Sequence, residues 1–285
     1  MTIWANDRPE SWFVAAARNQ VRTVIALVGT EASARFARKT FGVVEEVGGL
    51  AIVVAGLAAL RYFTGSRTHH GMPMVPFLTC GVFIFWTFKT TLSQSSTFAS
   101  AKARYEFMPR VTQLDVLIAR SIVNTLFYVG LALGAFTAFY FIGISDWMEQ
   151  PFLVIAVLLV SSLLGFGVGM IFGAINTFAP FFRTIQHVLM RVLMFTSGVH
   201  FIWPEVPYMF RWIIIENPLF HLCEFIRSGY FVAYESPVAS SLYLGVWIAS
   251  TLAIGLMCER LCRPFYERDR RRATENEDPF ALDGL

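Results

Sequence analysis

The chain has 285 residues, of which 55% are hydrophobic and only 15% are charged, whereas soluble domains have about 25% charged residues. Its mean hydropathy is +0.55 and its formal net charge is +3. These values exclude an ordinary soluble domain. We expect an integral membrane protein whose partners do not include nucleic acid.

The first 41 residues contain no apolar core that could serve as a cleavable signal peptide. Apolar residues recur at helical spacing at Val21, Ile25 and Val28, and Arg35 and Lys39 lie on other faces. We predict a cytoplasmic segment, residues 1–41, with an amphipathic helix on the membrane surface. A short soluble capping helix is the alternative.

Long runs without Asp, Glu, Lys or Arg follow, and the longest has 33 residues, between Glu149 and Arg183. About 20 helical residues cross a bilayer at about 1.5 Å per residue. Two spans are less clean, because charges border the first and Arg191 lies inside the fifth. We predict an all-α transmembrane domain over residues 42–262, with six spans at about 42–61, 73–92, 116–142, 151–177, 184–202 and 239–258.

The orientation follows from the distribution of Lys and Arg, which are enriched in cytoplasmic segments. Six arginines fall between Arg260 and Arg272, after the last span, and further basic residues precede the first span. We therefore expect both termini to be cytoplasmic. Residues 263–285 are polar and charged, and we expect a loosely ordered cytoplasmic tail.

The cytoplasmic loop between the second and third spans combines a charged patch with a helix break. The patch surrounds Tyr105 and consists of Lys102, Arg104 and Glu106. Pro109 ends the preceding helix, and Thr112 with Asp115 resembles a capping box that starts the next one. We predict a compact knob at the cytoplasmic surface, suited to docking a cytoplasmic partner.

The segment 203–237 is too polar to cross the membrane and unusually aromatic for a free loop. Pro204, Pro207 and Pro218 divide it into short helical pieces. We predict a re-entrant helical hairpin on the outer side, buried in protein or beside water. An ordinary interfacial loop is the alternative.

Searches for catalytic and metal motifs point away from an enzyme. The sequence has no Gly-rich phosphate loop followed by Lys and Ser or Thr, and Ser197 near His200 lacks a third group that would orient the base. His221 and Glu224 lie one turn apart, and we expect an interfacial hydrogen-bonded pair. We expect solvated side chains at residues 69–70, no metal site and no catalytic residue.

Candidate substrate-path residues come from the aromatic second span and from one buried cation. Flat sugar faces pack on aromatic rings, and the candidates are Phe85, Trp86 and Phe88, with helix packing as the alternative. Placing a charged side chain such as that of Arg191 within a membrane span costs free energy. Arg191 either meets an acidic substrate or pairs with Glu45 or Glu46.

Five segments, taken in order, resemble the membrane subunit of type-2 ABC exporters, in the branch that exports capsular polysaccharide and O-antigen. The resemblance covers about residues 20–265. The segments are GVFIFWTFKTTLSQSS (81–96), MPRVTQLDVLIARSIV (108–123), FTSGVHF (195–201), ENPLFHLCEFIRSGYF (216–231) and GLMCERLCRPF (255–265).

The resemblance implies a homodimer in the bacterial inner membrane. Each copy would bind a separate ATP-binding subunit that holds ATP and Mg²⁺, so that this chain itself binds no cofactor. Coupling would use the knob and the amphipathic helix that carries Arg35 and Lys39. The substrate would be a lipid-linked polysaccharide moving from cytoplasm to periplasm, where an adaptor and an outer-membrane export protein continue the path.

Two alternatives stay open. A type-2 ABC exporter of another cargo would move O-antigen, a teichoic acid-like polymer, a drug or a lipid. An ion-driven secondary transporter would show inverted repeats, and we find no internal repeat in the sequence.

Overall fold

The computed structural model describes residues 12–38, 40–63, 68–97, 105, 108, 111–232 and 234–277. These residues are mostly helical, with one small hairpin of strands β1 (Thr68–His69) and β2 (Met72–Pro73). The helices are α1 (Trp12–Arg38), α2 (Thr40–Phe63), α3 (Met74–Ser95), α5 (Gln113–Ile142), α6 (Pro151–Phe178), α7 (Phe182–Thr196), η2 (Trp203–Glu205), η3 (Tyr208–Phe210), α8 (Arg211–Ile215), α9 (Pro218–Tyr230) and α10 (Ser241–Glu277).

Five helices in the described part of the chain are long and apolar enough to cross a membrane: α2, α3, α5, α6 and α10. The expected all-α membrane architecture is therefore confirmed at this coarser level. The predicted fifth span corresponds to α7, which has 15 residues and so extends only about 22 Å against a hydrocarbon core of about 30 Å. Helix α10 continues to Glu277, so residues 263–277 extend the last helix instead of forming a loose tail.

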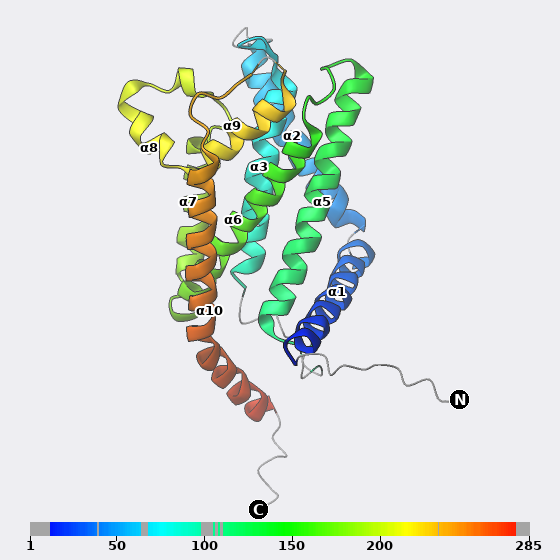
Figure 1. Ribbon diagram of the computed structural model, residues 1–285, viewed down its shortest axis with the longest axis vertical. Helices are drawn as coiled ribbons and strands as arrows, with labels where there is room; N and C mark the ends of the chain where they lie inside the picture. Colours follow the sequence, from blue (N-terminus) through cyan, green and yellow to red (C-terminus); the bar gives the residue numbers. More distant parts are fainter. Residues whose placement is uncertain are drawn as a thin grey trace, which may run out of the picture.

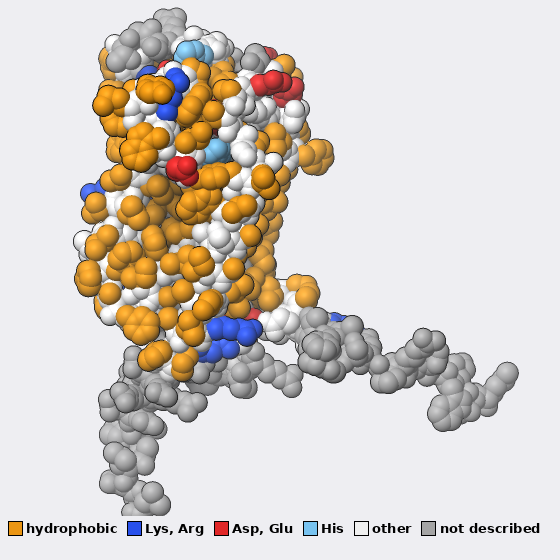
Figure 2. Space-filling view, turned by 60° about the vertical axis from the view of Figure 1, so that its left-hand side comes forward, with side chains coloured by type: hydrophobic (Ala, Val, Ile, Leu, Met, Phe, Trp, Pro, Cys, Tyr) orange, Lys and Arg blue, Asp and Glu red, His pale blue; other side chains and the backbone are white. Residues whose placement is uncertain are grey.

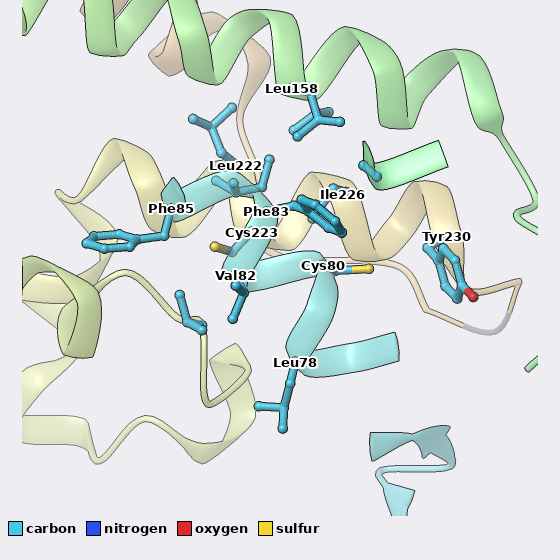
Figure 3. Close-up of a cluster of buried hydrophobic side chains, with 14 of the residues drawn as sticks. Leu78, Cys80, Val82, Phe83, Phe85, Leu158, Leu222, Cys223, Ile226 and Tyr230 are labelled. Carbon is cyan, nitrogen blue, oxygen red and sulfur yellow. The ribbon is translucent and has the colours of Figure 1, made fainter. Parts of the chain in front are cut away.

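The core of the bundle lies around α3, which contacts α2, α5, α6 and α9 (Figure 1). Its apolar side chains are buried almost without interruption from Met74 to Phe88. Figure 3 shows Cys80 and Phe83 of α3 close to Leu222 and Ile226 of α9. The short helix α9 therefore forms part of the core instead of covering it loosely.

Glycines bring α6 into close contact with its two neighbours. A Cβ atom at Gly165 would lie 2.6 Å from the backbone oxygen of Phe88, and one at Gly169 would lie 2.6 Å from that of Leu92. On the opposite face, a Cβ at Gly167 would lie 2.8 Å from Oγ1 of Thr251. Helix α6 thus packs backbone to backbone against α3 and α10, as small residues allow in membrane helices.

The predicted capping box at the start of α5 is confirmed. The backbone N–H of Asp115 donates to Oγ1 of Thr112 at 3.2 Å, and the backbone N–H of Thr112 donates to Oδ2 of Asp115 at 2.9 Å. The helix ends at Gly143, whose φ of +79° is the left-handed conformation that glycine adopts without strain. These two signals set both ends of the helix.

The molecule has two distinct ends. Helix α1 and the last turns of α10 lie at one of them, called here the α1 end, and the β-hairpin, α8 and α9 lie at the other, the α9 end (Figure 1). Hydrophobic side chains cover most of the visible face between the ends, and charged side chains gather mainly toward them (Figure 2). This is the surface expected of a bundle surrounded by lipid.

Candidate functional site

At the α1 end, Tyr105 connects the loop before α5 to α1. Its side chain is buried, and its hydroxyl donates a hydrogen bond to Oε1 of Glu31 at 2.9 Å. The same carboxylate oxygen accepts from Nε of Arg120, in α5, at 3.3 Å. Leu27 and Val111 pack in the same cluster. We call Glu31, Tyr105 and Arg120 the Glu31 cluster, and it joins the two elements, the knob and the N-terminal helix, that are predicted from the sequence to serve coupling.

Arg35 is partly buried and makes its hydrogen bonds within the fold, and its role in docking stays a prediction. Its guanidinium donates to Oε2 of Glu46 at 2.7 Å and to Oδ1 of Asn124 at 2.9 Å, and it stacks over the ring of Phe127. Glu46 is therefore paired with Arg35 and not with Arg191. The other predicted coupling residues lie outside the described residues, and their docking role stays a prediction: Lys39, Lys102, Arg104 and Glu106.

A polar network continues from Arg35 into the bundle. The side-chain amide of Asn124 donates to Oγ1 of Thr90 at 3.0 Å and of Thr91 at 2.9 Å, both on α3. The Thr91 hydroxyl lies 3.4 Å from that of Ser162 on α6. Buried groups that satisfy one another fix the relative positions of their helices. The network therefore connects α1, through α5 and α3, to α6.

Three of the predicted substrate-path residues lie on α3, where the ring centres of Phe85 and Trp86 are 6.1 Å apart, and the fourth, Arg191, lies on α7. Phe85 and Phe88 are buried in the core around α3, whereas Trp86 is only partly buried. Nζ of Lys89 lies 5.0 Å from the centre of the Trp86 ring. Arg191 is exposed on α7, away from these aromatics in the sequence and on another helix. Their role in a path stays a prediction.

At the α9 end, Arg227 holds the segment after α7 against α9. Its side chain is fully buried, and it donates to the backbone oxygens of Gly198 at 2.6 Å, Val199 at 3.0 Å and Phe201 at 2.9 Å. Sequence reasoning missed this residue. The available signal was a cation three residues after Glu224 in an apolar helix, a spacing that places both on one face.

Glu224 is the acidic partner of this arrangement. Its Oε1 lies 3.5 Å from Nη1 of Arg227, and its Oε2 accepts from the hydroxyls of Tyr234 at 2.5 Å and Ser236 at 2.7 Å. His221 instead contacts the backbone oxygen of Ile215 at 2.8 Å through Nε2. The expected pairing of His221 with Glu224 is therefore wrong, because each residue has its own partners.

A cavity of about 600 Å³ opens beside this network, between the β-hairpin, the loop after α5 and the segment after α9. Asp146 lines it together with five Phe, Tyr or Trp rings: Tyr140, Trp147, Tyr230, Phe231 and Tyr234. The hydroxyls of Tyr230 and Ser145 lie 2.6 Å apart. Aromatic faces with a few polar groups are the usual composition of small-molecule sites.

Comparisons with known proteins agree with this architecture. A family model described as ABC-2 type transporter matches residues 22–231. The polysialic acid transport protein KpsM of Escherichia coli is 28% identical over 72% of this chain and 81% of its own length. The capsule polysaccharide export inner-membrane protein BexB of Haemophilus influenzae is 22% identical, over 84% of this chain and 89% of its length. The corresponding protein CtrC of Neisseria meningitidis is also 22% identical, over 76% and 84%.

Proposed function

The chain belongs to the ABC-2 type transporter family, and we propose that it is the membrane permease subunit of an ATP-driven exporter of lipid-linked capsular polysaccharide. The observation that carries this proposal is the similarity to three capsule-type export proteins, each over more than two thirds of both chains. Transport runs from the cytoplasm to the periplasm, and the chain is a multi-pass protein of the bacterial inner membrane.

The hydrolysis of ATP belongs to a separate ATP-binding subunit, which also holds the nucleotide and Mg²⁺. That subunit docks at the α1 end, onto the knob and α1. The support for this surface is the Glu31 cluster, because Tyr105 and Arg120 attach the loop and α5 to the same carboxylate of α1. A movement of the loop that carries Tyr105, caused by the ATP-binding subunit, is therefore transmitted to α1 and α5 together.

We propose six crossings with both termini in the cytoplasm. Five are the long apolar helices, and the remaining one is α7 continued by residues 197–202, which Arg227 binds through their backbone. Helices α8 and α9, with 5 and 13 residues, are too short to cross. They form the re-entrant region, with its backbone satisfied inside protein as the bilayer requires.

Two copies of the chain form the transport path. The support is the outward surface of α2, where large hydrophobic side chains such as Ile52 and Leu60 are exposed, and a cavity of about 360 Å³ between α2, α3 and α5. Trp86 and Arg191 face the polymer in this assembly, and a periplasmic adaptor and an outer-membrane export protein receive it.

The path assignment gives a prediction for Trp86. Replacing Trp86 by Ala removes a partly exposed ring, and we expect surface polysaccharide to fall while the permease still assembles with its ATP-binding subunit. Export would be measured by staining of the cell surface and assembly by co-purification. The matched control is Trp247→Ala, on α10. Normal export by Trp86→Ala would leave this ring with a packing role only.

Transport itself is tested in vesicles. The permease and its ATP-binding subunit are reconstituted together with the lipid-linked polysaccharide of the host, and ATP is added outside. The proposal expects polymer to become protected from an added glycoside hydrolase only when ATP is hydrolysed. If the polymer stays accessible while a lipid or drug is moved under the same conditions, the cargo is that other class.

A further inference from the structure

The β-hairpin between α2 and α3 brings two consecutive histidines against a glutamate from a distant part of the chain. Nε2 of His69 lies 3.0 Å from Oε2 of Glu205, and Nε2 of His70 lies 3.4 Å from Oε1 of the same carboxylate. The sequence analysis expected both histidines to be solvated. That is wrong for His69, whose side chain is buried, because it packs on the ring of Phe77.

The contact between His69 and Glu205 does not have the geometry of a hydrogen bond. Nε2 of His69 is buried and, among the described residues, has no hydrogen-bond partner, although the carboxylate oxygen is 3.0 Å away. A buried polar atom without a partner is costly and calls for an explanation. The nitrogen and the oxygen approach each other without donor and acceptor being aligned, as two ligands of a common ion do.

The backbone around this cluster is held in a sparsely populated conformation. His69 pairs with Met72 in the hairpin, so His70 and Gly71 form a two-residue turn with φ of +49° and +85°. Such turns favour Asn, Asp or Gly at the first position, and a histidine there is strained by about 1 kcal/mol or more. Strain of this kind marks positions where the side chain is needed for another reason.

The carboxylate is also fixed in place. Glu205 is the last residue of η2, and its Oε2 accepts a hydrogen bond from the backbone N–H of Ile202 at 3.3 Å. The three residues therefore come from two separately positioned turns, the hairpin and η2. The histidine nitrogens and the carboxylate oxygens come together only because these two turns pack against each other.

We propose that Nε2 of His69, Nε2 of His70 and the carboxylate of Glu205 form a Zn²⁺ site at the α9 end. The three ligand atoms lie within 4.8 Å of one another. Tetrahedral Zn²⁺ with bonds of about 2.0 to 2.2 Å places neighbouring ligand atoms about 3.3 to 3.6 Å apart. The observed separations of 3.0 and 3.4 Å, each to a different oxygen of the carboxylate, are close to these values, and water completes the coordination.

The charges around the site act in both directions: the carboxylate of Glu205 favours a cation, whereas the positive charges of Arg61 and Arg227 act on His69 with the opposite sign. Arg61 donates to the backbone oxygen of His200 at 2.7 Å, and Arg227 donates to three backbone oxygens, so hydrogen bonds fix the positions of both guanidinium groups. A bound ion would tie the α2–α3 hairpin to η2.

The direct test is titration of the purified full-length chain in detergent with ZnCl₂ by calorimetry, using an affinity tag that contains no histidine. We expect one Zn²⁺ per chain. His70→Ala and Glu205→Gln should each weaken binding at least about tenfold, since loss of outer partners alone costs that much at metal sites. His187→Ala is the matched control, because His187 is exposed on α7 and its loss should leave binding unchanged.

Thermal unfolding provides a second readout that is independent of transport. A ligand that binds only the folded state raises the unfolding temperature, so Zn²⁺ should stabilise the unmodified chain and the His187→Ala variant but not His70→Ala. His70 is half exposed, so this variant is expected to fold. Absence of Zn²⁺ binding by the unmodified chain would overturn the proposal, and so would binding by His70→Ala and Glu205→Gln that is as tight as that of the unmodified chain.

Discussion

At the scale of single residues, two largely buried charges in the described part of the chain, Arg227 and Glu31, each have several partners. Arg227 donates hydrogen bonds to three backbone oxygens and lies beside the carboxylate of Glu224. Glu31 accepts hydrogen bonds from both Tyr105 and Arg120. Such partners stabilise a charge that is removed from water, although Nε of Arg227 and Oε1 of Glu224 have no hydrogen-bond partner among the described residues. Removing one partner therefore costs more than the pair contributes.

The first residue-scale prediction concerns Tyr105. Tyr105→Phe keeps the buried ring but removes the hydrogen bond to Glu31, and hydrogen bonds to charged groups contribute about 2 kcal/mol. We expect a lower thermal unfolding temperature and reduced export at an unchanged level of membrane insertion. The control is Tyr208→Phe, since Tyr208 is 86% exposed. Unfolding and export that match the unmodified chain would remove Tyr105 from the coupling path.

The second concerns Arg227. Arg227→Met keeps most of the side-chain volume but removes the donor to three backbone oxygens and the cation that faces the carboxylate of Glu224. Breaking a buried pair from one side costs about 3 to 5 kcal/mol, so we expect little folded protein after size-exclusion chromatography. Arg183→Met, at an exposed position of α7, should behave normally. A folded Arg227→Met variant with an unchanged melting curve would contradict this reading of the α9 end.

At the scale of elements, helix α6 packs very closely against two neighbouring helices, so its glycines are sensitive to substitution. Its glycines meet backbone atoms of α3 on one side and of α10 on the other. Gly165→Val would force α6 away from Phe88, at a cost of about 1 to 3 kcal/mol for overpacking. We expect lower thermal stability, measured in detergent. Gly130→Val is the control, because a Cβ there would meet nothing within 4 Å. Equal effects of the two substitutions would show that only helix propensity is changed.

The long helices could be predicted because lipid imposes a simple rule on composition. The expected spans 73–92 and 151–177 differ from α3 and α6 by only a few residues, since runs of uncharged residues define them. Thr112 and Asp115 marked the start of α5 because a capping box is local in sequence. The fifth span was less predictable, since α7 ends at Thr196 and a chain segment bound by Arg227 continues it.

The sites were harder to predict, because their partners are far apart in the sequence. The knob around Tyr105 was predicted, but nothing local indicated that its hydroxyl would bind Glu31, 74 residues away. Likewise, no periodic pattern connects His69 with Glu205. Aromatic residues such as Phe85 satisfied the pattern of a sugar-binding surface and yet lie in the core, because the same side chains serve helix packing.

At the scale of the whole molecule, the two ends have different structures that suit different tasks. The α1 end carries the Glu31 cluster and the start of the polar network, which reaches α6 through Arg35, Asn124 and Thr91. The α9 end carries a rigid buried helix and an aromatic cavity of about 600 Å³. In an exporter, the first would receive the motion of an ATP-binding subunit and the second would face the released polymer.

The most direct test of this account is the location of polysaccharide after the gene for this chain is deleted in its native host. The account predicts lipid-linked capsular polymer retained inside the cell and absent from the surface. Surface polymer should return on expression of the unmodified chain but only weakly with Tyr105→Phe. A normal capsule in the deletion strain, with no second exporter gene present, would contradict the proposed function.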